Sequence, residues 1–547
     1  MEEKFYSLLY PDEHSRETQV SIPKYITENI GFNDVKEWFY NTVRYKERHK
    51  QQLDQLLTEG HSIRYRQDIL SDITSSAGLQ EAIRQFLPRL YRLRTQFNEY
   101  IIGINDRTSD ALWKVDLYEC YASCMKELVD ILTTHQHICS EGLLLLRKYG
   151  FEMINNSTYM NGISALSRVR RLMDEIRFVS VDVQVNSLFE PNRAKMSIKK
   201  QERNKLGLLC ELFSAEQEKN HEHFSVKSHP VIGIQAIYNE KYKKQIEDIL
   251  QAADPVLRAY NRSDIEKMLE LDFELDFYLS AVCFNNRIKD MGIEMCVPVI
   301  CSDEDNVCVV EKAVDLGLVV RISKEEKINP KIISNKICLD DSARIYVLTG
   351  ANGGGKTTYL RSIGIVFMLF QNGLYVPGSH GRISPIQHLF IHFPQEEEKV
   401  AGEGRLGEEL VALRKILDQA VSGDVILLNE SLSGTSMAES MMICADFLRI
   451  LSELGVKCVF ATHLHVLADC LEEMNCYENV VSRMDSLTAV VEEIRCNDKV
   501  TERKRTYKIE RRKPEGESYA DDIAYAHGIS YEQIMLTRKE RGNINVL

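Results

Sequence analysis

The chain lacks any hydrophobic run long enough to cross a bilayer. Its longest apolar stretch, Ile363 to Phe370, is interrupted by Gly364, whereas a membrane-spanning helix takes about 20 predominantly apolar residues. The first residues, MEEKFYSLLYPDEHSR, also lack the basic start and apolar centre of a signal peptide. We therefore expect a soluble, cytoplasmic protein with no membrane partner.

The chain also lacks closely paired cysteines and an excess of positive charge. It has 14 cysteines but no C-x-x-C pair, and the nearest pair, Cys120 and Cys124, has helical spacing. We expect buried thiols in a reducing compartment, not disulfides or a metal site. The net charge of −13 argues against broad electrostatic binding to nucleic acid or anionic membrane. A local basic surface, or a clamp that encloses a polymer, is compatible with that charge.

Glycine and proline are scarce in the first ~320 residues, where helical patterns dominate. With 547 residues, 44% of them hydrophobic, the chain is expected to form several domains. Asp34 with Glu37 resembles a capping box. An apolar stripe follows at helical spacing and predicts a buried face: Val35, Trp38, Phe39 and Val43. Longer helices are predicted at Ser109–Tyr149, Ile237–Ala253 and Ser263–Met291.

One segment breaks the helical pattern. Phe178 to Val185 reads FVSVDVQV, where valines alternate with polar residues as in a half-buried strand. A turn containing Pro191 and a second strand near Ala194 to Ile198 are expected next. Basic residues flank this insertion on both sides: Arg168, Arg170, Arg171, Lys195, Lys199, Lys200, Arg203 and Lys205. Two interpretations stay open, a solvated charged surface and a nucleic-acid contact.

From about residue 337 the pattern changes to alternating strands and helices, which predicts a sheet covered by helices. Apolar strand-like segments occur at Ile345–Leu348, Val425–Leu428 and Cys458–Ala461. A further strand is expected at Thr506–Glu510, and helices from about Tyr519 onward. Basic residues near that strand are expected to face solvent on a hairpin: Arg503, Lys504, Arg505, Arg511, Arg512 and Lys513.

Residues 350–357 fit the phosphate-binding loop G-x-x-x-x-G-K-[ST], directly after an apolar run. In such a loop, backbone N–H groups surround phosphate oxygens at the start of a helix, and glycines let the chain close up without a Cβ clash. Lys356 would reach the β- and γ-phosphates, and Thr357 would hold Mg²⁺. The predicted ATP-binding residues are Gly350, Ala351, Asn352, Gly353, Gly354, Gly355, Lys356, Thr357 and Thr358.

Two later strand ends carry candidate catalytic residues. Residues 425–430 read VILLNE, and the Glu430 carboxylate would act as the general base that polarises the attacking water. Asn429 is a candidate Mg²⁺ ligand at a position that usually carries Asp, so we expect weaker Mg²⁺ binding or slower turnover. His463 ends the next strand, where it would contact a γ-phosphate or orient the water; a purely structural histidine is the alternative.

These residues resemble the MutS family of DNA-processing ATPases, within the ABC-type ATPase class. TGANGGGKTTYLRSIG resembles the family's phosphate loop, NESLSGTS its second motif, and FATHLHVLA its histidine motif. FMLFQNGLYVP and ESYADDIAYAHGI fit as well, so the resemblance covers residues 337 to 535. RQDIL at Arg66–Leu70 and LDFELDFYLSA at Leu271–Ala281 carry a weaker resemblance to the family's core and lever domains.

The resemblance implies a multidomain fold. Residues 1–336 would form a mainly α-helical core and lever region with a small β clamp at 178–235. Residues 337–547 would form an α/β ABC-type P-loop ATPase domain with a C-terminal helical dimerisation segment. The resemblance also implies a homodimer with two composite ATP sites that closes around DNA. Enclosing the polymer would reconcile an acidic chain with DNA binding.

Three features depart from the family pattern. Core-like sequence begins within the first ~60 residues, so we expect no mismatch-sensing domain. The family's Phe-x-Glu wedge occurs only at Phe97–Glu99, inside a helical-looking stretch. Gly404 stands at the position of the trans-acting signature Ser. Arg405 is a hypothetical substitute that would supply a cation to the opposite γ-phosphate.

Three functions follow from these patterns. The favoured one is a MutS-like, ATP-dependent DNA clamp in mismatch repair or on branched or recombining DNA, with slow, partner-stimulated ATP hydrolysis. The alternative is a slow nucleotide-switched binding module that acts on ribosomes or another non-DNA partner. A transporter ATPase subunit would need an L-S-G-G-Q-like signature, which the sequence lacks.

Overall fold

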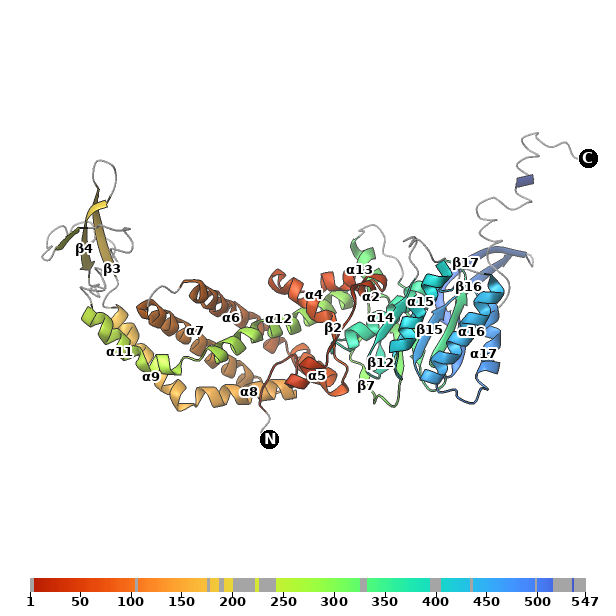
Figure 1. Ribbon diagram of the computed structural model, residues 1–547, viewed down its shortest axis with the longest axis horizontal. Helices are drawn as coiled ribbons and strands as arrows, with labels where there is room; N and C mark the ends of the chain where they lie inside the picture. The colour runs from red at the N-terminus through yellow and green to blue at the C-terminus, as the bar shows by residue number, and fades with distance from the viewer. Residues whose placement is uncertain are drawn as a thin grey trace, which may run out of the picture. The chain divides into compact units, whose positions relative to one another are not determined.

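The computed structural model describes residues 4–103, 107–174, 178–185, 191–199, 222–225, 243–324, 332–393, 405–432, 436–496, 499–514 and 534–535. The chain divides into two compact units. The helical unit comprises Met1–Phe5, Gly78–Ile138 and Leu143–Leu275, and the sheet unit comprises Tyr6–Ala77, Cys139–Gly142 and Asp276–Leu547. Figure 1 labels many of their helices and strands.

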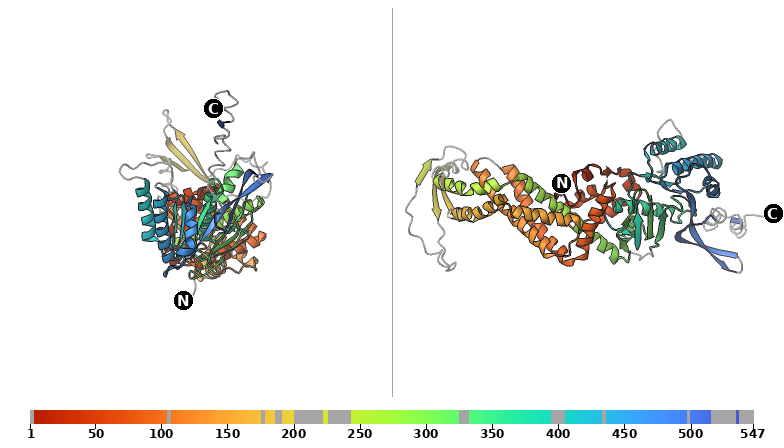
Figure 2. Two further views of the ribbon diagram at one scale, coloured as in Figure 1. Left: turned by 90° about the vertical axis from the view of Figure 1, so that its right-hand side faces the viewer. Right: turned by 90° about the horizontal axis from the view of Figure 1, so that it is seen from below.

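The helical unit is built from long helices, as the scarcity of glycine and proline predicts. They are α6 (Ala77–Gly103), α7 (Arg107–Thr134), α8 (Glu141–Ile154), α9 (Ser157–Asp174), α11 (Lys243–Ala259) and α12 (Arg262–Asp290). α6 and α12 lie side by side (Figures 1 and 2), and Arg94 Nε lies 3.2 Å from Asp272 Oδ2 between them. Within the described ranges, no helix is long and apolar enough to cross a membrane.

One predicted helix, Ser109–Tyr149, is two helices in the structure. α7 ends at Thr134 and α8 begins at Glu141. Between them, Asp72 Oδ2 accepts hydrogen bonds from the backbone N–H groups of Cys139 (3.0 Å) and Ser140 (2.7 Å), which pairs donors that the start of a helix leaves unsatisfied. The prediction was wrong because the break is stabilised by a carboxylate far away in the sequence.

The other two predicted long helices fared better. The helix predicted at Ser263–Met291 is confirmed as α12. The one predicted at Ile237–Ala253 begins in residues outside the described ranges. Its described part, α11, continues to Ala259 with Pro255 inside it, whereas proline inside a helix usually bends or ends it.

The two strands predicted near residue 180 are confirmed. β3 (Phe178–Val185) pairs antiparallel with β4 (Pro191–Lys199), so that Val181 lies opposite Met196. Pro191 begins the second strand and is not a turn residue. A third strand that we did not predict, β5 (Glu222–Ser225), pairs with the other edge of β4. Lys195 and Lys199 lie on β4, whereas Lys200, Arg203 and Lys205 lie outside the described residues.

The sheet unit begins with short elements: α1 (Glu13–Glu17), β1 (Val20–Ser21), α2 (Lys24–Asn29), α3 (Phe32–Trp38), η1 (Val43–Tyr45), α4 (Lys46–Leu53), β2 (Gln55–Leu56) and α5 (Gly60–Ser75). The predicted apolar stripe holds for Val35 and Phe39, which are buried. It fails for Val43, which is 77% exposed, because α3 ends at Trp38 and the helical spacing does not continue.

The capping box predicted at Asp34 and Glu37 is wrong. The helix starts earlier, at Phe32, with Gly31 in the capping position at φ +73°. Asp34 therefore lies inside the first turn, where its carboxylate pairs with Arg321 at 3.0 Å. A glycine that adopts a left-handed conformation at no steric cost outweighs the side-chain pattern that suggested a later start.

A small sheet and a two-stranded ribbon follow in the sheet unit. The small sheet has the order β7 (Val299–Ile300), β12 (His380–Ile383), β8 (Cys308–Ala313) and β9 (Asn335–Leu339). β6 (Met295–Cys296) pairs with β11 (Val376–Pro377), and α13 (Leu316–Lys324) packs against α3 and α14. These elements precede and interrupt the larger sheet along the chain.

The larger sheet positions the candidate site. Its order is β13 (Leu389–His392), β14 (Val425–Asn429), β15 (Lys457–Ala461), β10 (Ile345–Gly350), β16 (Met484–Cys496) and β17 (Lys499–Glu510). All neighbours are parallel except β16 and β17, which form an antiparallel hairpin. The strands predicted at 345–348, 425–428, 458–461 and 506–510 are thereby confirmed. Helices predicted after Tyr519 fall almost entirely outside the described residues.

Helices cover this sheet as the alternating pattern predicts. α15 (Arg405–Gln419), α16 (Met437–Leu454) and α17 (His465–Met474) pack on one face, where Leu413, Leu448 and Leu467 join the strand residues Val347 and Phe460 in one buried cluster. α14 (Lys356–Phe370), which is not part of that cluster, packs against β10, β14 and β15. The result is a helical region followed by a mixed α/β region (Figure 1).

Candidate nucleotide-binding and catalytic site

The predicted phosphate loop connects a buried strand to a helix. Every residue of β10 is buried, and the chain turns at residues 351–355 before α14 begins at Lys356. Gly350, Gly353 and Gly355 have φ of +126°, +69° and +98°, a region that side chains other than glycine rarely adopt. A Cβ atom on Gly350 would lie 3.0 Å from the backbone N and O of Ala489. The loop conformation therefore requires its glycines.

Lys356 lies folded against the loop that precedes it. Its Nζ donates to the carbonyl of Gly350 at 2.9 Å and to that of Ala351 at 3.4 Å. The side chain is 5% exposed. Burial lowers the pKa of Lys356, while the nearby carboxylate of Glu430 acts in the opposite direction. The ammonium group is thus held at the loop whose N–H groups would surround phosphate oxygens.

The two predicted Mg²⁺ ligands lie next to each other. Thr357 Oγ1, in the first turn of α14, donates to Asn429 Oδ1 at the end of β14 over 3.1 Å. Hydroxyl and amide oxygens suit Mg²⁺, which takes oxygen ligands together with water and substrate phosphates. The donor set therefore fits Mg²⁺, with one negative charge fewer than an Asp would provide. Within the described ranges, no group of three or more His, Cys, Asp or Glu could hold a metal ion.

The two predicted catalytic residues also meet. His463 Nε2 lies 3.0 Å from Glu430 Oε1, and the two side chains are 42% and 43% exposed. They follow β15 and β14, which pair in parallel, and the backbone N–H of Glu430 donates to the carbonyl of Ala461 at 2.7 Å. Parallel strands end at one edge of their sheet, which is where open α/β sheets bind ligands. The structure therefore brings Lys356, Thr357, Asn429, Glu430 and His463 to that edge.

Residues 346–524 match the family model of MutS domain V. This segment is a MutS domain V. MutS domain V is an ABC-type ATPase domain, so this part of the chain is similar to a domain that binds and hydrolyses ATP. The resemblance to MutS and the ATPase class predicted from the sequence are confirmed, whereas the roles of individual residues stay predictions.

The curated relatives that match this chain are distant in sequence and longer than the chain. It is 27% identical over 290 residues to the DNA mismatch repair protein MutS of Leptospira interrogans (51% of this chain, 34% of the relative). It is 29% identical over 165 residues to the protein of that name from Prochlorococcus marinus (30% and 17%). For Orientia tsutsugamushi the identity is 31% over 188 residues (32% and 21%). The chain spans at most about a third of the length of these relatives.

The hairpin of β16 and β17 carries two of the basic residues that were expected to face solvent. Arg505, on β17, is exposed as expected, and a Cβ atom on Gly353 would lie 3.0 Å from its Nη1. Arg511 is also exposed, and its Nε donates to Asp485 Oδ2 at 2.5 Å while its guanidinium lies 5.7 Å from the ring centre of Tyr346. The antiparallel pairing of β17 with β16 confirms the predicted hairpin; the closeness of Arg505 to the phosphate loop carries no local motif and was not predicted.

Sequence reasoning also missed the residues that hold the segment after Glu430. Leu432 N–H donates to Glu409 Oε2 at 2.5 Å, and Ser431 Oγ lies 2.6 Å from His392 Nδ1. Neither partner has a motif signal: Glu409 sits in an amphipathic helix and His392 ends a strand. Gly404, and the loop residues 433–435 of the second motif, lie outside the described residues, as does the side chain of Arg405.

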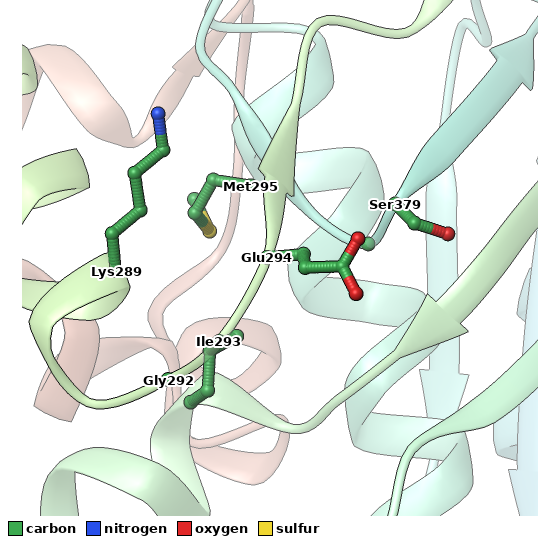
Figure 3. A pocket seen from close by; sticks show the side chains of 7 residues that line it. Lys289, Gly292, Ile293, Glu294, Met295 and Ser379 are labelled. Carbon is green, nitrogen blue, oxygen red and sulfur yellow. The ribbon is translucent and has the colours of Figure 1, made fainter.

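The sheet unit has a further open hollow of about 340 Å³, lined by Lys289, Gly292, Ile293, Glu294, Met295, Gly378 and Ser379. Figure 3 shows Lys289 and Glu294 on opposite sides of Met295. Glu294 is paired with Lys312 at 2.6 Å. None of the predicted site residues lines this hollow, so it contributes nothing to the ATPase site.

Proposed function

We propose that this chain is a MutS-like, ATP-dependent DNA-binding protein, a homodimeric clamp that acts on mismatched or branched DNA. The observation that supports this most is the meeting of Lys356, Thr357, Glu430 and His463 at one sheet edge of a MutS domain V. The name of these relatives, DNA mismatch repair protein MutS, supports DNA as the partner. Their greater length leaves the type of DNA to be established by experiment.

ATP would bind through residues 350–358, with Asn352 in the loop and Thr358 in the first turn of α14. Loop N–H groups and Lys356 would hold the phosphates, and the exposed Arg505 beside Gly353 would add positive charge. Thr357 and Asn429 would hold Mg²⁺, which when bound supplies charge neutralisation at the β- and γ-phosphates.

Hydrolysis would depend on Glu430 and His463. Glu430 is proposed to accept a proton from the attacking water, a role worth about 10² to 10⁴ in rate. His463, within 3.0 Å of that carboxylate, would orient the water and contact the γ-phosphate. Each turnover would reset the dimer from its closed to its open state.

The clamp role rests on the β3–β5 sheet and its basic residues. The insertion at 178–235 would close on DNA, residues 1–336 would serve as core and lever, and residues 337–547 would carry the ATPase and the dimer contact. Lys195 and Lys199 on β4 support a polymer-facing sheet. Free cysteines such as Cys124, Cys444 and Cys458 are consistent with the cytoplasm as the proposed location.

The proposed DNA role is tested by binding to a four-way junction, a mismatched duplex and a perfect duplex. We expect the affinity for the junction or the mismatch to exceed that for the perfect duplex by at least about tenfold. This is a conservative threshold, because specific binding usually exceeds non-specific binding by more than that. Equal, weak binding to all three would remove DNA as the partner and leave the ATPase assignment in place.

A second candidate, a slow nucleotide-switched module on ribosomes or another partner, is favoured by one observation. Asn429 places a neutral amide beside Thr357 where a carboxylate is usual. Tight ATP binding with turnover close to the uncatalysed rate, together with binding to ribosomes but not to DNA, would favour this candidate over the clamp.

A further inference from the structure

Residues 430–432 leave β14 in a backbone conformation that non-glycine residues rarely adopt. Glu430 has φ +54° and Leu432 has φ +61°, both in the left-handed region. Such conformations persist only where surrounding contacts impose them, and they gather at functional sites. The contacts made by Ser431 and Leu432 therefore help to hold the backbone from which the Glu430 carboxylate extends.

Leu432 is held at both of its backbone polar groups. Its N–H donates to Glu409 Oε2 at 2.5 Å, and its carbonyl accepts from Ser440 Oγ at 2.7 Å. Glu409, Ser440 and Leu432 are all buried, with Glu409 5% exposed. A hydrogen bond to a carboxylate is stronger than one between neutral groups, so Glu409 is the stronger of the two restraints.

Ser431 is held from the neighbouring strand. Its Oγ lies 2.6 Å from His392 Nδ1 and 3.4 Å from the carbonyl of His392. Burial lowers the pKa of His392, while the charge of Glu409 acts in the opposite direction. Glu409 and His392 therefore belong to one cluster around residues 431 and 432.

We propose that Glu409 is a positioning residue for ATP hydrolysis. By holding Leu432 N–H, it fixes residues 430–432 and keeps the Glu430 carboxylate at the sheet edge, 3.0 Å from His463. The inference rests on the proposed role of Glu430 as general base. Because Glu409 lies in the first turns of α15, which begins at Arg405, a displacement of that helix would also move Glu430.

The test compares three substitutions at Glu409 in the full chain. Glu409→Ala removes the acceptor, and we expect kcat to fall about 10- to 100-fold, the scale for a group misplaced by about an ångström, while the Kd for ATP changes less than about threefold. Glu409→Gln keeps an oxygen at the same reach and should stay within about threefold of the parent kcat. Glu409→Asp keeps the charge but shortens the side chain, so that the carboxylate no longer reaches Leu432 N–H. Its kcat should therefore be as low as that of Glu409→Ala.

Glu408→Ala is the matched control, because Glu408 is the adjacent carboxylate of α15 and is half-buried; its kcat should be unchanged. Thermal unfolding of each variant reports on folding, and the Gln and Asp variants decide the matter if Glu409→Ala does not fold. A slow Gln variant beside a fast Asp variant would overturn the proposal, because charge and not acceptor position would then matter.

A double-mutant comparison separates this inference from the function on which it rests. In a Glu430→Gln background, Glu409→Ala should cause no further loss of kcat, because the group it positions is already disabled. An equal loss in both backgrounds would overturn the positioning role. If Glu430→Gln alone hydrolyses ATP at the parent rate, the proposed base is wrong; if it is slow while Glu409→Ala is fast, only the positioning role fails.

Discussion

Asn429 is the residue expected to limit how strongly this site binds Mg²⁺. Its amide oxygen accepts from Thr357 at 3.1 Å, so its geometry suits a shared cation, yet it contributes no charge. The neighbouring Glu430 carries the negative charge instead and faces His463. At the residue scale, the site therefore separates the proposed metal position, which is neutral, from the proposed hydrolytic position, which is charged.

Replacing Asn429 with Asp should strengthen Mg²⁺ binding. One added charge about 4 Å from a cation is worth roughly 1 kcal/mol or more at the surface, so we expect the Mg²⁺ concentration that half-saturates ATP hydrolysis to fall about five- to tenfold. ATP affinity without Mg²⁺ is the control and should stay equal or weaken, because the carboxylate repels phosphates. An unchanged Mg²⁺ requirement would place the cation away from residue 429.

Replacing Glu430 with Gln should slow ATP hydrolysis strongly and leave ATP binding nearly unchanged. The amide keeps the shape of the side chain but cannot accept the proton, so kcat should fall about 10² to 10⁴-fold with the Kd for ATP within a few-fold of the parent. Single-turnover hydrolysis and equilibrium ATP binding give the two values. Parent-like turnover by this variant would contradict the assignment of the base.

At the scale of elements, the strands that follow from a local sequence pattern could be predicted, whereas contacts between residues far apart in the sequence could not. β10, β14 and β15 could be predicted because each is a short apolar run that ends at Gly350, Asn429 or Ala461. The burial of Glu409 could not, because an acidic residue in an amphipathic helix normally faces solvent. Its partner, Leu432 N–H, is brought to it by the fold and carries no sequence signal.

The phosphate loop itself offers a test at this scale. Gly350→Ala adds a methyl group 3.0 Å from the backbone of Ala489, and we expect a loss of about 2–4 kcal/mol in the free energy of unfolding from left-handed strain plus overpacking. Gly292→Ala is matched for positive φ, +77°, but has nothing within 4 Å, so its loss should be only about 1–2 kcal/mol. Denaturant unfolding measures both; equal losses would contradict the steric part of the argument.

On the scale of the whole chain, an acidic molecule is proposed to bind an acidic polymer. The net charge is −13, so attraction cannot come from the protein's overall field and must come from a local surface such as the β3–β5 sheet. Salt should therefore weaken binding through only a few phosphate contacts. An ATP-driven closure around DNA would slow the dissociation of the protein from DNA, which electrostatic attraction alone would not do.

Nucleotide bound in domain V is proposed to control how long the protein stays on DNA. The most direct measurement is the dissociation rate from the preferred DNA with ADP and with a non-hydrolysable ATP analogue, for the parent chain, Lys356→Ala and Lys415→Ala, an exposed lysine of α15. We predict at least about a tenfold difference between nucleotides, or ~1.4 kcal/mol, which Lys415→Ala keeps and Lys356→Ala loses. Equal dissociation rates with ADP and with the ATP analogue in the parent chain would contradict nucleotide control of DNA binding.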